Sequence, residues 1–294
     1  MLRFGIDLGG TKIEGAILDE RGAIVFRERI ATEAAGGYAH IVGRIAMLYR
    51  RMAASAGTAP HRLGIGTPGS LSPVTGRLRN SNTVSMNGQP LVADLEAALG
   101  RPFTIENDAN CFALAEALQG AGRNNKVVFG VIMGTGCGGG IVWDGVVHRG
   151  RNAIGGEWGH HVIDPAGARC YCGANGCAET FISGSGLERA YRACGGAART
   201  AHAIVALADA NDVTAAAVMA TFYDRFGRAI ANLLNILDPD IVVLGGGLSN
   251  IDALYTHGVE AVRRQVFSDQ LTTPIVGNKL GDSAGVIGAA LIGT

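Results

Sequence analysis

The sequence has no excess of charge of either sign and no long hydrophobic run. Its 25 lysine and arginine residues equal its 25 aspartate and glutamate residues, so the formal net charge is zero. A nucleic-acid or membrane-surface partner requires a basic excess that neutralises phosphates, and we expect neither partner. Gly, Asn or Asp residues interrupt the longest apolar stretches. These stretches are therefore shorter than the about 20 residues that a membrane span requires. The first residues enter a strand pattern without a secretory signal, and we therefore expect a cytoplasmic protein.

Two common nucleotide-binding signatures are also missing. The chain has 45 glycines among 294 residues, about twice the usual frequency, yet no glycine-rich stretch has Walker A or Rossmann spacing. Because the glycines follow no collagen period and no low-complexity tract, we expect them at tight turns and points of close backbone approach. The hydrophobic content of 48% provides a sizeable core, and the length fits about two domains.

Two segments about 125 residues apart resemble each other. Residues 4–19 and 129–144 each have an apolar strand pattern, a glycine-rich turn, a second strand pattern and another turn. That order is typical of a β-hairpin in which glycine supplies the positive φ of the turn. The repeat predicts two similar domains that face one another.

Helix and strand patterns alternate along the rest of the chain, which indicates α/β layers. We expect a domain boundary near 110–125, with the last helix returning to the first domain. The predicted helices cover about 38–56, 91–99, 109–120, 184–235 and 284–291, and the predicted strands lie near 62–66, 103–106 and 241–244.

Three glycine-rich turns have the composition of phosphate-binding loops. In the first, the amides of Gly9 and Gly10 could approach a phosphate, while Thr11 and Lys12 add a hydroxyl donor and a positive charge. Asp7 could hold Mg²⁺ directly or through water. Each turn alone could equally be an ordinary turn, but together they indicate a polyphosphate clamp and a nucleoside site. The other two turns are Gly134-Thr135-Gly136 and Gly245-Gly246-Gly247.

A carboxylate lies where a predicted strand meets a predicted helix. Asn107 or Asp108 could simply cap that helix. Alternatively, Asp108 accepts the proton of a sugar hydroxyl that attacks phosphorus, because phosphoryl transfer needs positioning, charge neutralisation and one such carboxylate. The sequence alone leaves both interpretations open.

Three of the six cysteines lie within eight residues, shortly after two histidines. In a reducing compartment such a cluster indicates a metal more than disulfides, and three Cys with one His form a closed, structural zinc site. Zinc would also fix the loop on which Glu157 and Glu179 lie, whose carboxylates either bind sugar hydroxyls or are surface charge. The predicted ligands are Cys170, Cys172 and Cys177 with His160 or His161.

Seven short motifs are spread over essentially the whole chain, namely residues 7–12, Gly66-Thr-Pro-Gly69, Glu106-Asn-Asp-Ala-Asn110, 134–136, Glu157-Trp-Gly-His160, the Cys-x-Cys-Gly-x-x-Gly-Cys loop and 245–247. In combination they resemble the ROK family of bacterial sugar kinases, within the actin/hexokinase-like ATPase superfamily. This resemblance implies an α/β fold of two actin-like (ribonuclease H-like) domains with a cleft between them and a zinc-stabilised loop in the second. The implied limits are 1–118 and 119–283, with residues 284–294 returning to the first domain.

The resemblance also implies an activity, the phosphorylation of a hexose by Mg-ATP. Asp108 would be the catalytic base, and His160 rather than His161 would ligate Zn²⁺. The glycine turns would bind Mg-ATP, and closure of the domains would exclude water. A homodimer with only small-molecule partners is expected. The implied sugar ligands are Gly69, Asn82 (or Asn80), Asn107, Glu157, His160 and Glu179.

Within the family, the chain resembles bacterial fructokinases of the manno(fructo)kinase type at residues 72–76, 87–90, 157–160, 179–184 and 235–240. This predicts phosphorylation of the 6-hydroxyl of D-fructose, with mannose as a further substrate. The closest fructokinases, however, carry a longer insertion between the zinc His and the first Cys than the nine residues found here.

Three alternatives compete with the fructokinase hypothesis. The first is a glucokinase or N-acetylglucosamine kinase of the same family, although related N-acetylglucosamine kinases tend to differ at Trp158 and around Phe181. A sugar-sensing repressor would carry a basic helix-turn-helix domain ahead of the first glycine turn, which here begins at residue 7. A zinc-stabilised binding module would have degraded phosphate turns, and these are intact.

Overall fold

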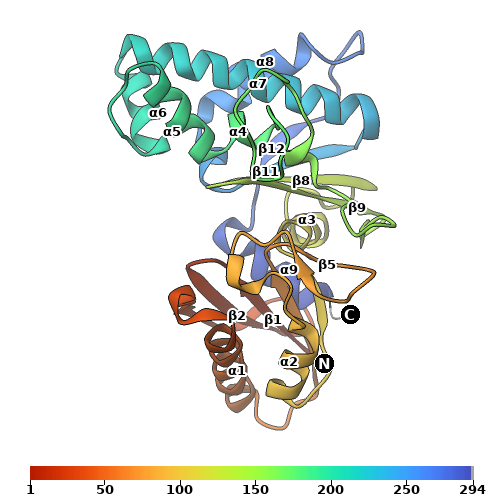
Figure 1. The fold of residues 1–294 in the computed structure, drawn as a ribbon. Helices are drawn as coiled ribbons and strands as arrows, with labels where there is room; N and C mark the ends of the chain where they lie inside the picture. The colour runs from red at the N-terminus through yellow and green to blue at the C-terminus, as the bar shows by residue number, and fades with distance from the viewer. Residues whose placement is uncertain (293–294) are drawn as a thin grey trace. The chain divides into compact units, whose positions relative to one another are not determined.

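The computed structural model describes residues 1–292 and divides by its contacts into two compact units. The first contains residues 1–120, 140–155 and the segment that begins at Leu280, and the second contains 121–139 and 156–279. Figure 1 shows that each unit has helices packed on a β-sheet, so the predicted two-domain α/β fold is confirmed.

The limits of the two units can be compared with the predicted domain limits. Residues 140–155 group with the first unit, whereas the predicted limits placed them in the second domain, and the exact limits stay a prediction. The last two residues of the predicted segment 284–294 lie outside the described residues.

The first unit is built on a five-stranded sheet of order β3-β2-β1-β4-β7. Strands β1 to β3 form an antiparallel meander, and β4 and β7 extend the sheet parallel to β1. The pairing of Phe4 with Ile17 confirms the hairpin predicted for residues 4–19. The strands are β1 (Leu2–Leu8), β2 (Lys12–Leu18), β3 (Ile24–Ala31), β4 (His61–Thr67) and β7 (Thr104–Asn107), with a short ribbon of β5 (Ser70–Leu71) and β6 (Leu78–Arg79).

Helices cover both faces of this sheet, with α1 on one face and α9 on the other (Figure 1). Helix α1 buries an apolar stripe that includes Ile41, Ile45 and Leu48, as its helical periodicity predicts. The helices of the unit are α1 (Gly37–Ala56), α2 (Leu91–Leu99), α3 (Asp108–Gln119) and α9 (Ala284–Ile292), with short helices η1 (Ala34–Gly36), η2 (Val84–Met86) and η6 (Gly281–Ser283).

Two glycines let α9 rest directly on the sheet. A Cβ on Gly5 of β1 would lie 2.2 Å from the carbonyl oxygen of Val286, and a Cβ on Gly64 of β4 would lie 1.9 Å from that of Ala289. Only glycine permits so close an approach. Helix α9 thus packs on the sheet of the first unit, while the return of residues 284–294 to the first domain stays a prediction with the other domain limits.

The second sheet repeats the plan of the first, with the order β10-β9-β8-β11-β12. Strand β11 lies parallel to β8 and β12, and β10 is antiparallel to β9. The predicted repeat is therefore real at the level of topology. Its strands are β8 (Val127–Met133), β9 (Cys137–Trp143), β10 (Val146–Val147), β11 (Ile241–Gly245) and β12 (Ile275–Gly277).

Most of the helices of the second unit follow the second hairpin. They are α4 (Glu179–Ile182), α5 (Gly184–Ala193), α6 (Ala201–Asp209), α7 (Val213–Leu237) and α8 (His257–Arg263), with short helices η3 (Trp158–His160), η4 (Gly247–Asn250) and η5 (Asp252–Tyr255). The long helix α7 packs against α8, α6 and α5.

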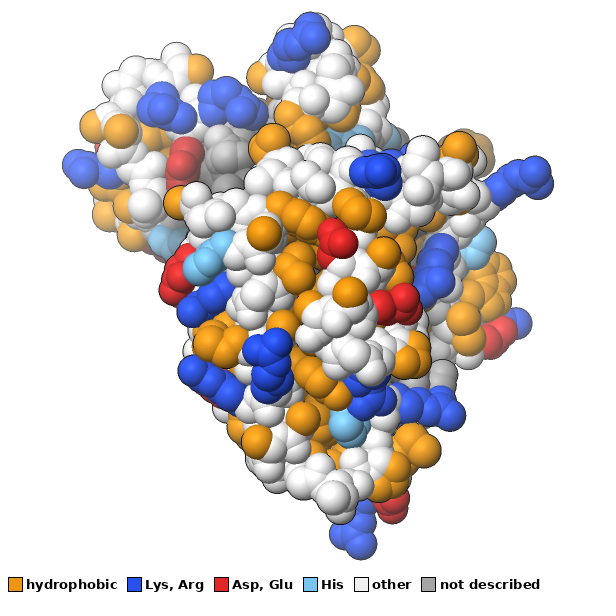
Figure 2. All heavy atoms as spheres, turned by 60° about the horizontal axis from the view of Figure 1, so that its bottom comes forward, with side chains coloured by type: hydrophobic (Ala, Val, Ile, Leu, Met, Phe, Trp, Pro, Cys, Tyr) orange, Lys and Arg blue, Asp and Glu red, His pale blue; other side chains and the backbone are white. Residues whose placement is uncertain are grey.

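The surface carries charges of both signs. Figure 2 shows one face on which basic, acidic and hydrophobic side chains are interspersed. Within residues 1–292, no single helix is long and apolar enough to cross a membrane, and one bent pair, α6 with α7 at 111°, has the length and composition only when taken together.

Candidate active site and metal centre

Asp108 is the first residue of α3, directly after strand β7 ends. The cap of this helix is Asn107, whose side-chain oxygen accepts from the backbone N–H groups of Ala109 (2.9 Å) and Asn110 (3.2 Å). The Asp108 carboxylate accepts from Ala109 N at 2.8 Å. Because Asn107 serves as the cap, the capping interpretation does not account for Asp108, whose predicted role as a base stays open.

Asp7 lies at the end of β1 and is electrostatically coupled to Asp108. Desolvation, followed by the negative charges of Asp108 and Glu14, raises the pKa of Asp7 from 3.8 to about 7, against the smaller opposing effects of Lys12 and Arg29. Carboxylates that repel one another in this way favour a divalent cation, which would remove the repulsion. The first unit therefore brings the predicted base and the predicted Mg²⁺ ligand into one neighbourhood.

This raised pKa makes a prediction for stability. The folded protein holds a proton on Asp7 that the unfolded chain releases, so this residue lowers stability as the pH rises from about 4 to about 7. Three pKa units correspond to about 4 kcal/mol, and partial exposure of Asp7 reduces this. We expect Asp7→Asn to raise the free energy of unfolding by about 1–3 kcal/mol at pH 8 and to change it little at pH 4.

Urea unfolding at the two pH values, without nucleotide or Mg²⁺, measures this effect. The exposed Asp269 provides a matched control, since Asp269→Asn removes the same charge from a solvated position. Equal stability changes at pH 4 and pH 8 for Asp7→Asn would contradict the raised pKa.

The first glycine turn joins β1 to β2. Gly9 N donates to the carbonyl oxygen of Lys12 at 2.9 Å, and the hydroxyl of Thr32 donates to that of Gly9 at 2.7 Å. The tip residues Gly10, Thr11 and Lys12 are exposed. The backbone of the turn is thus held by the sheet while its tip faces solvent, as a phosphate-binding turn requires.

Gly69 lies beside Asn107 in the first unit. The Asn107 amide donates to the Gly69 carbonyl oxygen at 3.0 Å. Gly69 has a φ of +83°, and a Cβ there would lie 2.3 Å from the carbonyl oxygen of Arg79, so only glycine fits. Asn80, with a φ of 59°, and Asn82 follow on this loop and are both exposed. The predicted sugar ligands of the first unit therefore lie on connected segments.

The two glycine turns of the second unit lie at the carboxyl ends of neighbouring parallel strands. Gly245 of β11 is in register with Ile132 of β8, and a Cβ on Gly246 would lie 2.5 Å from the carbonyl oxygen of Met133. Ligands of open α/β sheets bind at such strand ends. Helix α5 braces the Gly134 turn, since Gly184 N donates to the Gly134 oxygen at 2.8 Å.

A pocket of about 180 Å³ lies beside these turns in the second unit. Its lining includes Gly134 and Thr135, which the sequence predicted, and side chains that it did not. No motif in the sequence identified the latter side chains as part of a site. The one recognisable feature is the N-cap of α6, Thr200, whose hydroxyl accepts from Ala203 N. The unpredicted lining residues are Gly184, Ser185, Glu188, Thr200, Ala201, His202 and Leu248.

The two predicted carboxylates of the second unit have different settings. Glu179 begins α4, and its Oε2 accepts from Cys137 N at 2.9 Å, which ties it to the end of the second glycine turn. Glu157 is partly exposed and precedes η3. Trp158 anchors η3, since its Nε1 donates to the Gly138 oxygen at 3.0 Å and its ring meets Phe129 edge to face. Both carboxylates are therefore positioned by buried neighbours.

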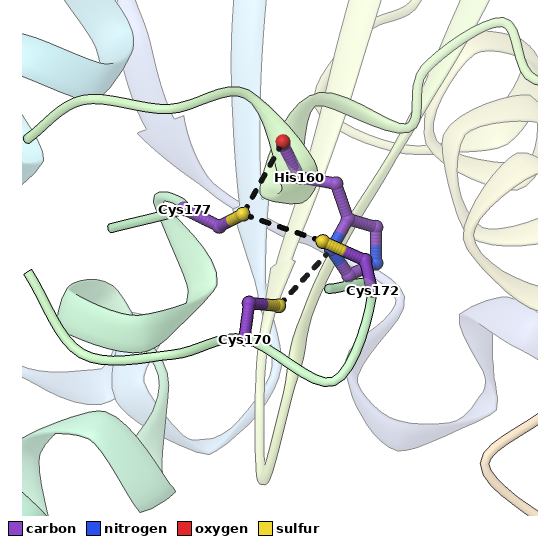
Figure 3. Close-up of side chains that lie close together, drawn as sticks. All are labelled: His160, Cys170, Cys172 and Cys177. Carbon is purple, nitrogen blue, oxygen red and sulfur yellow. Dashed lines mark hydrogen bonds between the residues drawn. The ribbon is translucent and has the colours of Figure 1, made fainter. Parts of the chain in front are cut away.

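His160 and the three clustered cysteines converge on one point (Figure 3). Their ligand atoms all lie within 4.8 Å of one another, with Cys172 Sγ and Cys177 Sγ 3.5 Å apart and His160 Nδ1 3.5 Å from Cys170 Sγ. Two thiolates on one tetrahedral Zn²⁺ would be about 3.8 Å apart. The donor set and its spacing thus fit a closed zinc site.

His161 points elsewhere. Its Nδ1 contacts the carbonyl oxygen of Trp158, its Nε2 lies 3.4 Å from the amide nitrogen of Asn232, and its ring stacks on Trp158. Of the two histidines that the spacing left open, the structure therefore brings His160 to the cysteines.

The pKa values of two of the clustered thiols shift in opposite directions. Desolvation raises the pKa of Cys177 to about 12, whereas a hydrogen bond from the backbone N–H of Ala174 lowers the pKa of Cys172. A bound metal would deprotonate all three thiols, so metal binding is expected to release protons and to weaken at low pH.

Comparison with known proteins places the chain in a family. The family model described as "ROK family" matches residues 3–293. The N-acetyl-D-glucosamine kinase of Pasteurella multocida (strain Pm70) is 36% identical, with 99% of each chain covered. The crystal structure of a ROK hexokinase from Thermus thermophilus has a TM-score of 0.89 at 34% identity and covers 100% of this chain and 98% of the other.

A third similar protein is the ROK family glucokinase of Streptomyces griseus, solved in complex with glucose and AMPPNP. Its TM-score is 0.83 at 28% identity, with 100% of this chain and 99% of that chain covered. None of these three proteins is named for fructose, so the predicted fructose preference gains no support. The match over nearly every residue shows that the chain belongs to the ROK family.

Proposed function

We propose that the chain is a sugar kinase that transfers the γ-phosphoryl group of Mg-ATP to the 6-hydroxyl of N-acetylglucosamine, with glucose as a second substrate. The observation that carries this proposal is the full-length likeness to an N-acetyl-D-glucosamine kinase at 36% identity. The short segment of nine residues between His160 and Cys170 agrees with it, because the fructokinases that the chain resembles carry a longer insertion there.

Asp108 is the proposed catalytic base. Its carboxylate would accept the proton of the attacking sugar hydroxyl while the new oxygen–phosphorus bond forms and the bond to ADP breaks. Its place at the first turn of α3 is suited to this role, because the N-terminal end of a helix stabilises negative charge there. Its bond to Ala109 N fixes the direction of the carboxylate.

The glycine turns are the proposed phosphate ligands. Gly10, Thr11 and Lys12 present amides, a hydroxyl and an ammonium group at an exposed tip. In the second unit, the pocket beside Gly134 and Thr135 has room and polar groups for a nucleoside. Asp7 would hold Mg²⁺, which neutralises charge on the phosphates.

Zinc is the proposed structural metal, held by His160, Cys170, Cys172 and Cys177. With four protein ligands the metal has no open coordination position. It would therefore stabilise the loop and take no direct part in phosphoryl transfer. It would fix two proposed sugar ligands, Glu157 directly before η3 and His160 at the end of η3. The predicted homodimer and the cytoplasmic location stay predictions.

The ranking of substrates tests this function. We expect N-acetylglucosamine to have the highest kcat/KM in an ADP-release assay with Mg-ATP, ahead of glucose and at least about tenfold ahead of mannose and fructose, which corresponds to about 1.4 kcal/mol of transition-state binding. Fructose in first place would restore the fructokinase interpretation. Sugar binding without any turnover would favour a sugar-sensing protein over a kinase.

A further inference from the structure

Tyr171 stands between two of the clustered cysteines and contacts the clustered histidine. Its hydroxyl lies 2.9 Å from His160 Nε2, and its ring meets the imidazole edge to face with centroids 5.0 Å apart. The tyrosine is nevertheless 68% exposed. A large aromatic side chain in solvent that makes one polar contact to a predicted sugar ligand calls for an explanation.

The contact uses a nitrogen that the proposed function also needs. His160 Nδ1 faces Cys170 Sγ at 3.5 Å and is therefore the atom of His160 that would bind the metal. With Nδ1 on a metal, the imidazole keeps one polar atom, the Nε2–H donor. If His160 also binds a sugar, it must do so through Nε2, and the hydroxyl of Tyr171 already accepts from that atom.

We propose that the Tyr171 hydroxyl occupies the place of a sugar hydroxyl on His160 Nε2 and that the incoming sugar displaces it. This inference rests on the proposed function, because it assigns Tyr171 a role in the sugar site of that kinase. Tyr171 is then a positioning residue, which keeps the imidazole oriented and hydrogen-bonded until substrate arrives and competes with every sugar for the same donor.

The surroundings of Tyr171 support this place for the sugar. Glu179 begins α4 two residues after Cys177, and Glu157 precedes η3, the short helix that ends at His160. The Tyr171 hydroxyl thus contacts one predicted sugar ligand, and the other two in this unit lie two or three residues from a member of the Cys/His group. Exposure of the ring leaves the side chain room to swing into solvent when the hydroxyl is displaced.

A purely structural role for Tyr171 would have different consequences. Partners that orient a metal-binding histidine are typically needed for metal affinity, and their loss costs about 10- to 100-fold. Such a tyrosine would be required for zinc and, through zinc, for sugar binding. A tyrosine that stands in for the sugar would be dispensable for zinc, since water can accept from Nε2 in its place.

The experiment compares Tyr171→Phe with the wild type by calorimetric titration of N-acetylglucosamine and of glucose, without ATP, in the zinc-loaded protein. A neutral hydrogen bond contributes a factor of about two to ten in an equilibrium constant. We expect Tyr171→Phe to bind sugar two- to tenfold more tightly, with the zinc content, zinc affinity and KM for ATP unchanged. Tyr223→Phe is the matched control, because Tyr223 also lies beside a histidine, His257, at 5.8 Å.

Each other outcome overturns the inference. Weaker sugar binding with zinc retained would mean that the Tyr171 hydroxyl contacts the sugar itself. Lower zinc affinity would make the residue structural, and unchanged binding of both would make the contact incidental. Absence of sugar binding by the wild type would refute the proposed function, which distinguishes that failure from a failure confined to Tyr171.

Tyr171→Gly, which also removes the ring, should bind sugar at least as tightly as the wild type.

Discussion

Asp108→Asn is expected to lower kcat by about 10²–10⁴-fold, while the dissociation constants of sugar and ATP stay within about threefold of wild type. Asparagine keeps an oxygen that can accept from Ala109 N, as Asp108 does at 2.8 Å. It cannot take the proton of the sugar hydroxyl. The loss therefore falls on the chemical step, and it is measured by single-turnover phosphorylation beside equilibrium binding of both ligands.

A matched control separates loss of the base from loss of a helix charge. Asp94 is the acidic residue in the first turn of α2, as Asp108 is in α3. Asp94→Asn removes the same charge from the first turn of another helix and also weakens a bond to Tyr38. It should reduce stability slightly and leave kcat near wild type. Retention of wild-type turnover by Asp108→Asn would exclude Asp108 as the base.

Removal of the proposed zinc ion is expected to have the second large effect. Cys172→Ser, or a strong chelator, should abolish stoichiometric zinc and weaken sugar binding on the order of 100-fold, because metal binding in small sites supplies about 10–16 kcal/mol of ordering free energy. ATP affinity should change less, since the turns at 134–136 and 245–247 are held by strands β8 and β11. Zinc analysis, thermal unfolding and titration with each ligand measure these effects.

Cys194 offers the control for this experiment. It is an exposed free cysteine in the second unit, as Cys172 is, but it does not belong to the cluster. Cys194→Ser should keep zinc, sugar affinity and thermal stability. A Cys172→Ser protein that lost zinc but kept both its unfolding temperature and its sugar affinity would show that the metal does not order the sugar site.

The hexose could not be read from the sequence for a physical reason. Kinases that prefer different hexoses differ by a few kcal/mol of transition-state binding, which a few side chains and the length of one loop supply. The motifs at residues 7–12, 106–110 and 157–160 describe the chemistry that such kinases share. Fructose was predicted from the segments at residues 72–76, 87–90, 157–160, 179–184 and 235–240. The comparisons with N-acetylglucosamine, hexose and glucose kinases favour the alternative.

The sequence by itself determined the features that depend on short stretches of chain. The two hairpins, the glycine turns, helix α1 and the Cys-rich loop all follow from local periodicity, from glycine at positions of close approach and from metal-ligand spacing. Each of these features depends only on residues that are close together in the chain, so the local sequence pattern is enough to predict it.

Tertiary structure decided what depends on residues far apart in the chain. It made Asn107 the cap of α3, turned His161 toward Asn232 and left His160 with the cysteines. It also raised the pKa of Asp7 by burial and by the charge of Asp108, a hundred and one positions away in sequence. Spacing cannot reveal such effects, because burial and charge proximity exist only after the strands and helices have packed.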